Sequence, residues 1–523
     1  MIGAGLFGPA LASAQSSAAD QGMGSYFDVR RFGATGKRAD SATAPIQTAV
    51  DACAAAGGGT VYVPPGEYTV GSIRLKDNVT LHLESGASLL LSQSKADFPS
   101  GSRSMIFAEN ARNIAVTGKG TLDGLAQYVF TEMRGLDVEI AGEIEIARKA
   151  GLDMRRYYRT GMQTYMFILN NCTDVLLRDI SVIHSPLWTV RMNDCDRVRI
   201  HGVYIYSDLE KGVNADGIDI VSSRNVTISD SIITTADDAI VLKTIRRADQ
   251  AANPTENVTV TNCLLSSSSS PLMIGTETEA DIHHVIFSNC VIRNSNKGFG
   301  INVQDGATVR DILFSNLTIE TSRRHWNWWG SSEMCKIVLK KRTPESRLGA
   351  IRDVVMDNII AHPRGTSLIA GHPERPIENI SMSNVRVLMS PEDAKDKRAS
   401  DALRIEGVRG LRIRDLEVRW TEEQVEEKWR SALVLRDVAD FDIQSFAGRQ
   451  GLKQSNAPAV LLDNVREGTI RDSRAVRDCG TFIHIQGEAS KDITLRNNDS
   501  RKALTPVSYE RANLRKIVRS VKP

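Results

Sequence analysis

The sequence predicts an all-β protein, a single right-handed parallel β-helix with an N-terminal helical cap and inserted loops over one face. Three observations predict this solenoid. A phrase of one polar residue, alternating β-branched residues and then Asn or Asp recurs along the chain, as in Asn225–Asp230, Asn257–Asn262 and His284–Asn289. Successive copies are about one coil apart, which is the mark of a repeat architecture. Helical periodicity is rare, and paired strands joined by two-residue turns are few, which argues against hairpins.

The N-terminal cap is expected to be a helix over residues 43–56. Its apolar residues fall on one helical face; they are Ile46, Ala49, Val50 and Cys53. Three consecutive glycines at 57–59 end the helix. The first coil then begins with strands over 60–63 and 67–70, because both segments alternate around β-branched residues.

The β-helix is expected to span residues 26–501 as one catalytic domain, since a solenoid can run far past the usual domain length. Residues 1–25 are interpreted as a signal-peptide remnant or a disordered tail. An apolar run followed by Ala12-Ser13-Ala14 favours the signal, and with it a secreted or periplasmic location. Residues 502–523 are polar and basic and are set apart as a C-terminal tail, either folded over the last coil or loose.

Composition excludes several classes of protein. The 65 Lys and Arg nearly cancel the 63 Asp and Glu, so no basic excess points to nucleic acid. No apolar stretch of about 18 residues follows the N-terminus, which argues against a membrane span. The seven cysteines show no C-x-x-C spacing, and neither a metal nor a cofactor is expected. Two pairs recur at coil intervals and predict stacked interior thiols, with a cross-coil disulfide left open: Cys172 with Cys195, and Cys263 with Cys290.

Two segments interrupt the repeat. Residues 126–165 include an expected helix from Glu139 to Tyr158, and residues 321–345 form an expected Trp-rich loop. Insertions in a solenoid become loops on one face, which is often the binding face. The tryptophans of this loop either stack on sugar rings or pack on the solenoid wall; they are Trp326, Trp328 and Trp329. The flanking residues Arg323, Arg324 and Glu333 are candidates for contacts to polar sugar groups.

Three aspartates carry the strongest indication of chemistry. Asp216 precedes Asp237 and Asp238 by 21 and 22 residues, close to one coil. Because coils stack at about 4.8 Å, the three carboxylates should lie together, and crowding should raise at least one pKa. One raised and one ordinary carboxyl form the acid/base pair that glycoside hydrolysis requires. The alternative is structural, since Asp is common in the turns of such coils.

The motifs around these aspartates resemble glycoside hydrolase family 28, the polygalacturonase and rhamnogalacturonan hydrolase family. Asn214-Ala-Asp-Gly217 resembles its Asn-Thr-Asp-Gly motif, and Ala236-Asp-Asp-Ala-Ile-Val-Leu-Lys243 resembles its Gly-Asp-Asp-x-Ile-x-x-Lys motif. Phe27–Ala34 and Ser185–Trp188 also resemble phrases of the family. The resemblance implies an inverting hydrolase of a pectic or related polysaccharide that needs no cofactor.

By the same resemblance, Asp237 is the general acid, and Asp216 and Asp238 hold and deprotonate the attacking water. Asn214 and Lys243 would orient carboxylates or contact sugar, although Lys243 could equally be an ion-pair partner. Inversion requires carboxyl groups about 6.5–9.5 Å apart. Two further candidates for sugar contacts are Trp188, which could stack or belong to the core, and Glu277.

The sequence also departs from the family pattern. Residues 266–275 lack the family's Gly-His-Gly, and Lys297–Asn302 replaces its Arg-x-Lys, so that Gly300 and Asn302 fall at the cationic positions. A buried sugar carboxylate needs a positive partner. The departures therefore favour a rhamnogalacturonan-like substrate over homogalacturonan. A Ca²⁺-dependent lyase and a non-catalytic glycan-binding β-helix remain alternatives.

Overall fold

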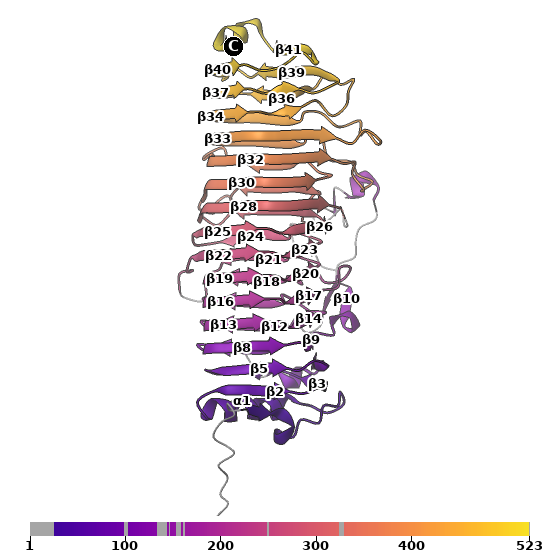
Figure 1. Ribbon diagram of the computed structural model, residues 1–523, viewed down its shortest axis with the longest axis vertical. Coiled ribbons are helices and arrows are strands. Elements are labelled where there is room, and N and C mark those ends of the chain that lie inside the picture. Colours follow the sequence, from indigo (N-terminus) through magenta and orange to yellow (C-terminus); the bar gives the residue numbers. More distant parts are fainter. Residues whose placement is uncertain are drawn as a thin grey trace, which may run out of the picture.

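The computed structural model describes residues 26–98, 103–132, 144–145, 147–152, 158–160, 163–247, 250–323 and 329–521. These residues form a tall stack of coils, in which strands from successive coils lie one above the other (Figure 1). One 40-stranded sheet with parallel pairing runs through the stack, and the predicted parallel β-helix is confirmed. Among the described residues, no helix is both long and apolar enough to span a membrane.

The N-terminal cap is the helix α1 (Thr43–Ala55), at the bottom of the stack in Figure 1. All four residues of the predicted apolar face are buried in the core: Ile46, Ala49, Val50 and Cys53. The helix ends where Gly57, Gly58 and Gly59 adopt positive φ angles, which residues with a Cβ rarely adopt. The chain then enters β2 (Gly59–Val63) and β3 (Gly66–Val70), so the predicted cap and first strands are confirmed to within a residue.

The recurring Asn and Asp have a structural cause. Asn225 and Asn257 have φ angles of 55° and 57°, a left-handed conformation that Asn tolerates better than most residues. The Asn257 side-chain amide donates a 3.1 Å hydrogen bond to the side-chain oxygen of Asn225, one coil earlier. The polar residue of each phrase therefore makes the turn and ties it to the next coil, while the alternating apolar residues fill the interior.

The interior is aliphatic, with short aromatic stacks such as Phe299 on Phe314, whose ring centroids are 4.2 Å apart. All seven cysteines lie in the described part of the chain, where they are buried and free. The prediction of stacked interior thiols is confirmed, and the cross-coil disulfide that it left open is not formed.

The C-terminal segment continues the solenoid. Strand β41 (Ala503–Tyr509) pairs in parallel with β39 (Cys479–Gln486), and β42 (Val518–Val521) pairs with β40 (Lys491–Arg496). The residues set apart as a tail thus form the last coil. Its residue Leu514 is buried, which is how this end of the core is covered.

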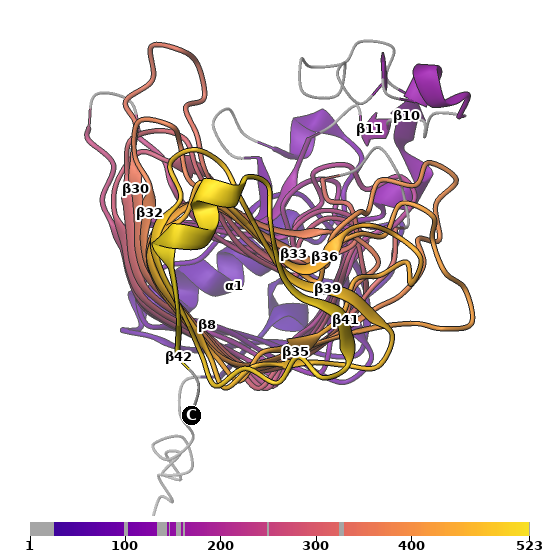
Figure 2. The same cartoon turned by 90° about the horizontal axis from the view of Figure 1, so that it is seen from above.

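The first insertion differs from its prediction. Strands β10 (Phe130–Glu132) and β11 (Tyr158–Thr160) form a separate antiparallel pair beside the stack (Figure 2). The expected helix is present in part, at residues 144–145 and 147–150, but its predicted end at Tyr158 is wrong because Tyr158 belongs to β11. Its expected beginning at Glu139 lies outside the described residues.

Candidate active site

The three predicted aspartates lie together at one turn of the solenoid. Asp216 precedes β18 (Ile218–Val221), and Asp237 and Asp238 precede β21 (Ile240–Thr244), which pairs with β18 one coil later. One oxygen from each carboxylate lies within 4.8 Å of the others. Gly217 allows this approach, because a Cβ on it would stand 2.3 Å from the carbonyl oxygen of Ala239. The glycine next to Asp216 is therefore required by the close contact of two coils.

Burial raises the pKa values of these carboxyl groups more than the neighbouring negative charges do. Burial, and then the charge of Asp238, raises the pKa of Asp237 to about 7. Burial, and then the charge of Asp237, raises the pKa of Asp216 well above its usual range. The sequence predicted a raised pKa from crowding alone, whereas the larger cause is the loss of water around carboxyl groups that are almost wholly enclosed. Near neutral pH, Asp237 is poised between its two protonation states.

Asp238 is held by hydrogen bonds. The Ser269 hydroxyl donates to its Oδ1 at 2.8 Å, and the Ser270 backbone N–H donates to the same oxygen at 3.1 Å. These serines occupy the segment where the family's His is missing. The carboxyl group of Asp238 is therefore fixed in position beside Asp237 by donors from the next coil.

The nearest carboxylate oxygens are closer together than the 6.5–9.5 Å expected between whole carboxyl groups. A water that donates to two oxygens at about 2.8 Å each, with its ordinary bond angle, spans about 4.4 Å between them. The oxygens lie within 4.8 Å of one another, a limit that admits one bridging water. Three oxygens at these distances could also ligate a divalent cation such as Ca²⁺, which binds oxygen at 2.3–2.6 Å.

Lys243 is fixed beside the cluster by two neighbours. Its Nζ lies 2.7 Å from Oε2 of Glu277 and 5.0 Å from the centroid of the Trp188 ring. Burial alone would lower the pKa of Lys243, but the negative charges of Glu277, Asp219 and Asp216 raise it above its ordinary value. Burial likewise opposes the charge on Glu277, whose pKa Lys243 nevertheless lowers. Lys243 is therefore a charged ion-pair partner at the edge of the carboxylate cluster.

Two site residues were not singled out from the sequence. Asp219 is fully buried on β18, its carboxylate oxygens accept no hydrogen bond from the described residues, and burial raises its pKa well above the usual range. Lys297 begins β27 (Lys297–Val303), and its Nζ donates a 3.0 Å hydrogen bond to Oγ of Ser270. Burial lowers the pKa of Lys297, which the carboxylates of Glu333, Asp238 and Asp237 oppose. The sequence signal for Asp219 was an aspartate within the apolar run of Ile218, Ile220 and Val221. No sequence signal marked Lys297.

Lys297 also corrects an inference from the sequence. The absence of cations at Gly300 and Asn302 predicted an uncharged neighbourhood, but Lys297 reaches the cluster from the start of the same strand. Lys336 is the parallel partner of Gly300 one coil later, on β29 (Glu333–Leu339), and its side chain is exposed. The positive charge is present but comes from other positions.

The remaining predicted residues are placed less centrally. Trp188 packs edge-on against Tyr165 with ring centroids 6.1 Å apart, and the Arg191 guanidinium lies 5.1 Å from the centroid of the Trp188 ring. The indole of Trp188 is therefore held by neighbouring side chains, but it is only half-buried. Asn214 is a half-buried turn residue with a φ of 60°. The side-chain oxygen of Asn302 is buried and makes no hydrogen bond within the described part of the chain. Each of these residues is a candidate rather than an established sugar contact.

Of the three tryptophans in the predicted loop, only Trp329 is described, and it is half-buried; Trp326, Trp328 and Arg324 lie outside the described residues. Part of the predicted loop is a strand, because β29 begins at Glu333. The hypothesis that Arg323 contacts sugar is wrong. Its side chain is fully buried, and its Nη2 forms a 2.9 Å ion pair with Asp396. Glu333 is also buried, as the register partner of Lys297.

A parallel β-helix with buried aspartates clustered on adjoining coils is an architecture suited to acid/base cleavage of a glycan. The model of the glycosyl hydrolases family 28 matches residues 53–402, about two thirds of the chain. The chain therefore belongs to this family, as its motifs predicted.

Known relatives agree with this assignment. The exo-poly-alpha-D-galacturonosidase of Dickeya chrysanthemi is 25% identical over 302 residues, which cover 50% of this chain and 49% of the relative. The chain thus spans about half the length of that curated relative. Solved structures show the same fold at lower identity. The family 28 exopolygalacturonase of Yersinia enterocolitica has a TM-score of 0.62 at 18% identity, over 80% of this chain and 78% of that one. The exopolygalacturonase of Thermotoga maritima has a TM-score of 0.58 at 21% identity, over 70% and 87%.

Proposed function

We propose that this protein is an inverting glycoside hydrolase that cleaves a galacturonate-containing pectic polysaccharide. The observation that carries the proposal is a carboxyl group of raised pKa that lies within a cluster of three aspartates. Asp237 has a pKa raised to about 7, so that it can carry a proton at neutral pH. Its neighbour Asp238 is held in position by hydrogen bonds from the Ser269 hydroxyl and the Ser270 N–H. An acid and a base held side by side are what glycoside hydrolysis needs.

In this mechanism, Asp237 protonates the leaving glycosidic oxygen. Asp216 and Asp238 hold one water between their oxygens, and Asp238 removes its proton as the water attacks the anomeric carbon from the opposite face of the sugar. The bond to the leaving oxygen breaks as the bond to water forms, and the configuration inverts. Lys243, anchored by Glu277, keeps positive charge near the cluster and balances part of its negative charge.

For the finer specificity, we propose a backbone in which galacturonate alternates with a neutral sugar, as in rhamnogalacturonan. Lys297 and Lys336 supply positive charge for a sugar carboxylate, and a charged hydrogen bond of this kind is roughly twice as strong as a neutral one. Gly300 and Asn302, at the positions of the family's Arg-x-Lys, offer no charge of their own. The galacturonan-cleaving relatives support the uronate, while these two positions support the neutral partner.

The test is the release of reducing ends by the wild type and by Asp237→Asn. The substrates are rhamnogalacturonan and homogalacturonan, with ultraviolet absorbance followed for an unsaturated product. We expect release without absorbance, faster on rhamnogalacturonan, and at least a hundredfold loss in the variant, since general acid catalysis contributes about 10²–10⁴-fold. An unsaturated product lost on addition of EDTA would instead establish a lyase. Release from homogalacturonan alone would leave the hydrolase intact and refute the finer specificity.

A polymeric pectic substrate would be met outside the cytoplasm, and we propose a secreted or periplasmic location for this reason. Fractionation of cells that express the full-length protein, with detection of the protein in each fraction, tests it. Recovery only from the cytoplasm would contradict this location without bearing on the chemistry.

A further inference from the structure

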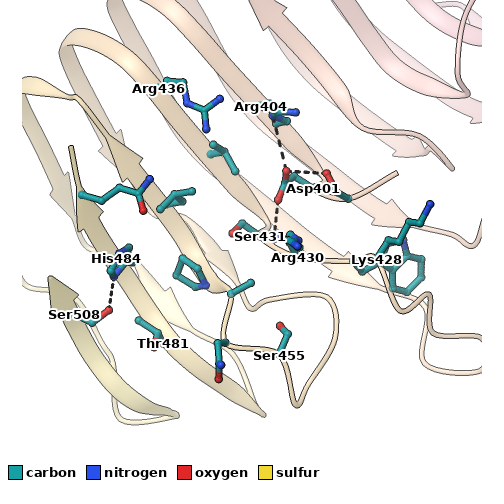
Figure 3. A pocket seen from close by; sticks show the side chains of 18 of the residues that line it. Asp401, Arg404, Lys428, Arg430, Ser431, Arg436, Ser455, Thr481, His484 and Ser508 are labelled. Atoms are coloured by element: carbon teal, nitrogen blue, oxygen red, sulfur yellow. Dashed lines mark hydrogen bonds and ion pairs between the residues drawn. The ribbon is translucent and has the colours of Figure 1, made fainter. Parts of the chain in front are cut away.

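A cavity of about 960 Å³ lies several coils nearer to the C-terminus than the carboxylate cluster. Figure 3 shows the side chains that line it. A continuous line of parallel partners joins the two places. It runs from Val241, just after the aspartate pair, through one residue of each coil: Met273, Gly300, Lys336, Leu368 and Arg404. These five steps, at about 4.8 Å each, amount to about 24 Å. The cavity is therefore well separated from the cluster but faces the same way.

The same line of residues forms the floor of the cavity. From Arg404 it continues through consecutive coils as Val434, Leu461, His484 and Ser508, all of which line the cavity. The middle of this floor is apolar and its ends are polar. A pyranose ring presents the same combination, because its faces carry C–H groups and its rim carries hydroxyls. Long segments before β34 (Leu433–Gln444) and β36 (Pro458–Asp463) form the walls.

The exposed charged side chains of the walls are more often positive than negative. The Arg430 side chain is exposed and forms no ion pair or hydrogen bond with the described residues, and Lys428 bonds only to the backbone oxygen of Lys397. Glu427 is an exposed acidic residue on the same segment. Arg404 and Arg436 pair with Glu406 and Asp463. The remaining carboxylate of the lining, Asp401, is buried and accepts hydrogen bonds from the Ser431 N–H and the Ser400 hydroxyl. Two exposed cations against one exposed carboxylate therefore favour an anionic ligand.

Several polar atoms of the lining have no protein partner within the described part of the chain. Ser455 Oγ and Nε1 of the fully buried Trp429 form no hydrogen bond, although both are enclosed. Nε of Arg404 is 3.9 Å from Asp401, too far for a hydrogen bond. Buried donors without partners are rare and call for an explanation. The lining therefore holds polar groups that the described part of the fold leaves unsatisfied, although Trp429 itself is enclosed in the core and is not open to a ligand.

We propose that this cavity is a second saccharide-binding site, which holds a uronate-containing stretch of the pectic chain away from the point of cleavage. The proposal rests on the proposed function for its choice of ligand. Exposed Lys336 lies on the line between the two sites, so that a polyanionic chain bound at the cluster meets positive charge on its way to the cavity. The site would retain the polymer between cleavage events and would add nothing to the binding of substrates too short to reach it.

Binding is tested first, with trigalacturonate as the probe and isothermal titration calorimetry as the measurement. In Asp237→Asn protein, which should not consume the probe, we expect two classes of site. Adding Arg430→Glu, or Thr481→Trp to fill the cavity, should remove one class and leave the other. Adding Arg466→Glu should change neither; Arg466 is an exposed arginine of β37 (Arg466–Arg471), outside the cavity, and has no ion pair among the described residues. Titrations that are the same in all four proteins would overturn the proposal.

Hydrolysis is tested second. In otherwise wild-type protein, Arg430→Glu should raise KM for the polymer about tenfold and leave kcat/KM for tri- and tetrasaccharides within twofold, whereas Arg466→Glu should alter neither. An unchanged polymer KM in both cavity variants, with their melting temperatures preserved, would refute the proposal. If the wild type hydrolyses no pectic substrate while the cavity variants still lose one class of bound trigalacturonate, then the proposed function fails and the binding site stands.

Discussion

Asp237→Asn should make the protein more stable at neutral pH while it abolishes hydrolysis. In the unfolded chain this carboxyl group loses its proton near pH 3.8, but in the folded protein burial holds the pKa at about 7. Between these pH values the folded state binds more protons than the unfolded state, so rising pH favours unfolding. The stability that the neutral carboxyl provides is complete below about pH 4 and is lost as the pH rises through 7. Asparagine never ionises and escapes this loss.

The magnitude follows from the same pKa values. At 1.36 kcal/mol per pH unit, the interval between 3.8 and about 7 corresponds to about 4 kcal/mol of unfolding free energy by neutral pH. With an unfolding entropy of about 2.1 cal/mol/K per residue, 523 residues give about 1.1 kcal/mol/K. The expected gain in melting temperature is therefore about 4 °C at pH 7, and near zero at pH 4. Asparagine keeps an oxygen that can accept the 3.0 Å hydrogen bond from the Asp238 N–H, so no new unsatisfied group is created there.

Scanning calorimetry of both proteins between pH 4 and pH 8 measures this difference. Asp174→Asn is a suitable control, because hydrogen bonding to Arg197 lowers the pKa of that exposed carboxyl, and its neutralisation should bring no gain at pH 7. A melting-temperature difference for Asp237→Asn that does not grow with pH, or a variant less stable than the wild type at pH 7, would refute the argument that burial raises this pKa.

Three further outcomes follow from particular contacts. Lys297→Met should lower kcat/KM on uronate substrates roughly tenfold, because it removes the cation beside Ser270 and Asp238. Lys340→Met, which removes an exposed lysine, should leave kcat/KM unchanged. Steady-state kinetics of the two variants and the wild type measures the difference. Thiol titration in denaturant without reductant should find seven thiols; five would mean that one cross-coil disulfide forms. Gly468→Ala should destabilise the fold by about 1–3 kcal/mol by the same calorimetry, since its Cβ would stand 1.9 Å from Cε1 of the Phe441 ring.

The repeat made the fold and the aspartate cluster predictable. In a parallel solenoid, residues about one coil apart in sequence are neighbours in space, so a separation of 21 residues between Asp216 and Asp237 translated directly into a contact. The glycine run at 57–59 ended α1 as predicted, because its backbone adopts conformations that suit few other residues. Periodicity thus converts sequence distance into spatial distance, and it did so wherever the repeat was unbroken.

Prediction failed where side chains reach across coils or where the chain leaves the repeat. The expected helix runs past its true end because β11 pairs with β10, a contact that local periodicity does not encode. Arg323 looked like an exposed flank of a binding loop, yet Asp396, 73 residues away, buries it in an ion pair. Lys297 was overlooked because its role depends on the length and direction of its side chain. The C-terminal cavity escaped notice because its lining comes from five coils, none of which carries a motif by itself.

The departures from the family motif are better explained as a rearrangement of the site than as its loss. A retired active site has no need for enclosed like charges, whose burial favours neither folding nor solubility. Here the segment without the family's His supplies Ser269 and Ser270, which hold Asp238, and the strand without the Arg-x-Lys begins with Lys297, which bonds to Ser270. Each missing group is thus accompanied by a polar side chain that reaches the same cluster from a neighbouring position. Charged and hydrogen-bonding groups thus surround Asp237 and Asp238 although the residues that supply them differ from the family motif, which supports the proposal of an active site over that of a retired one.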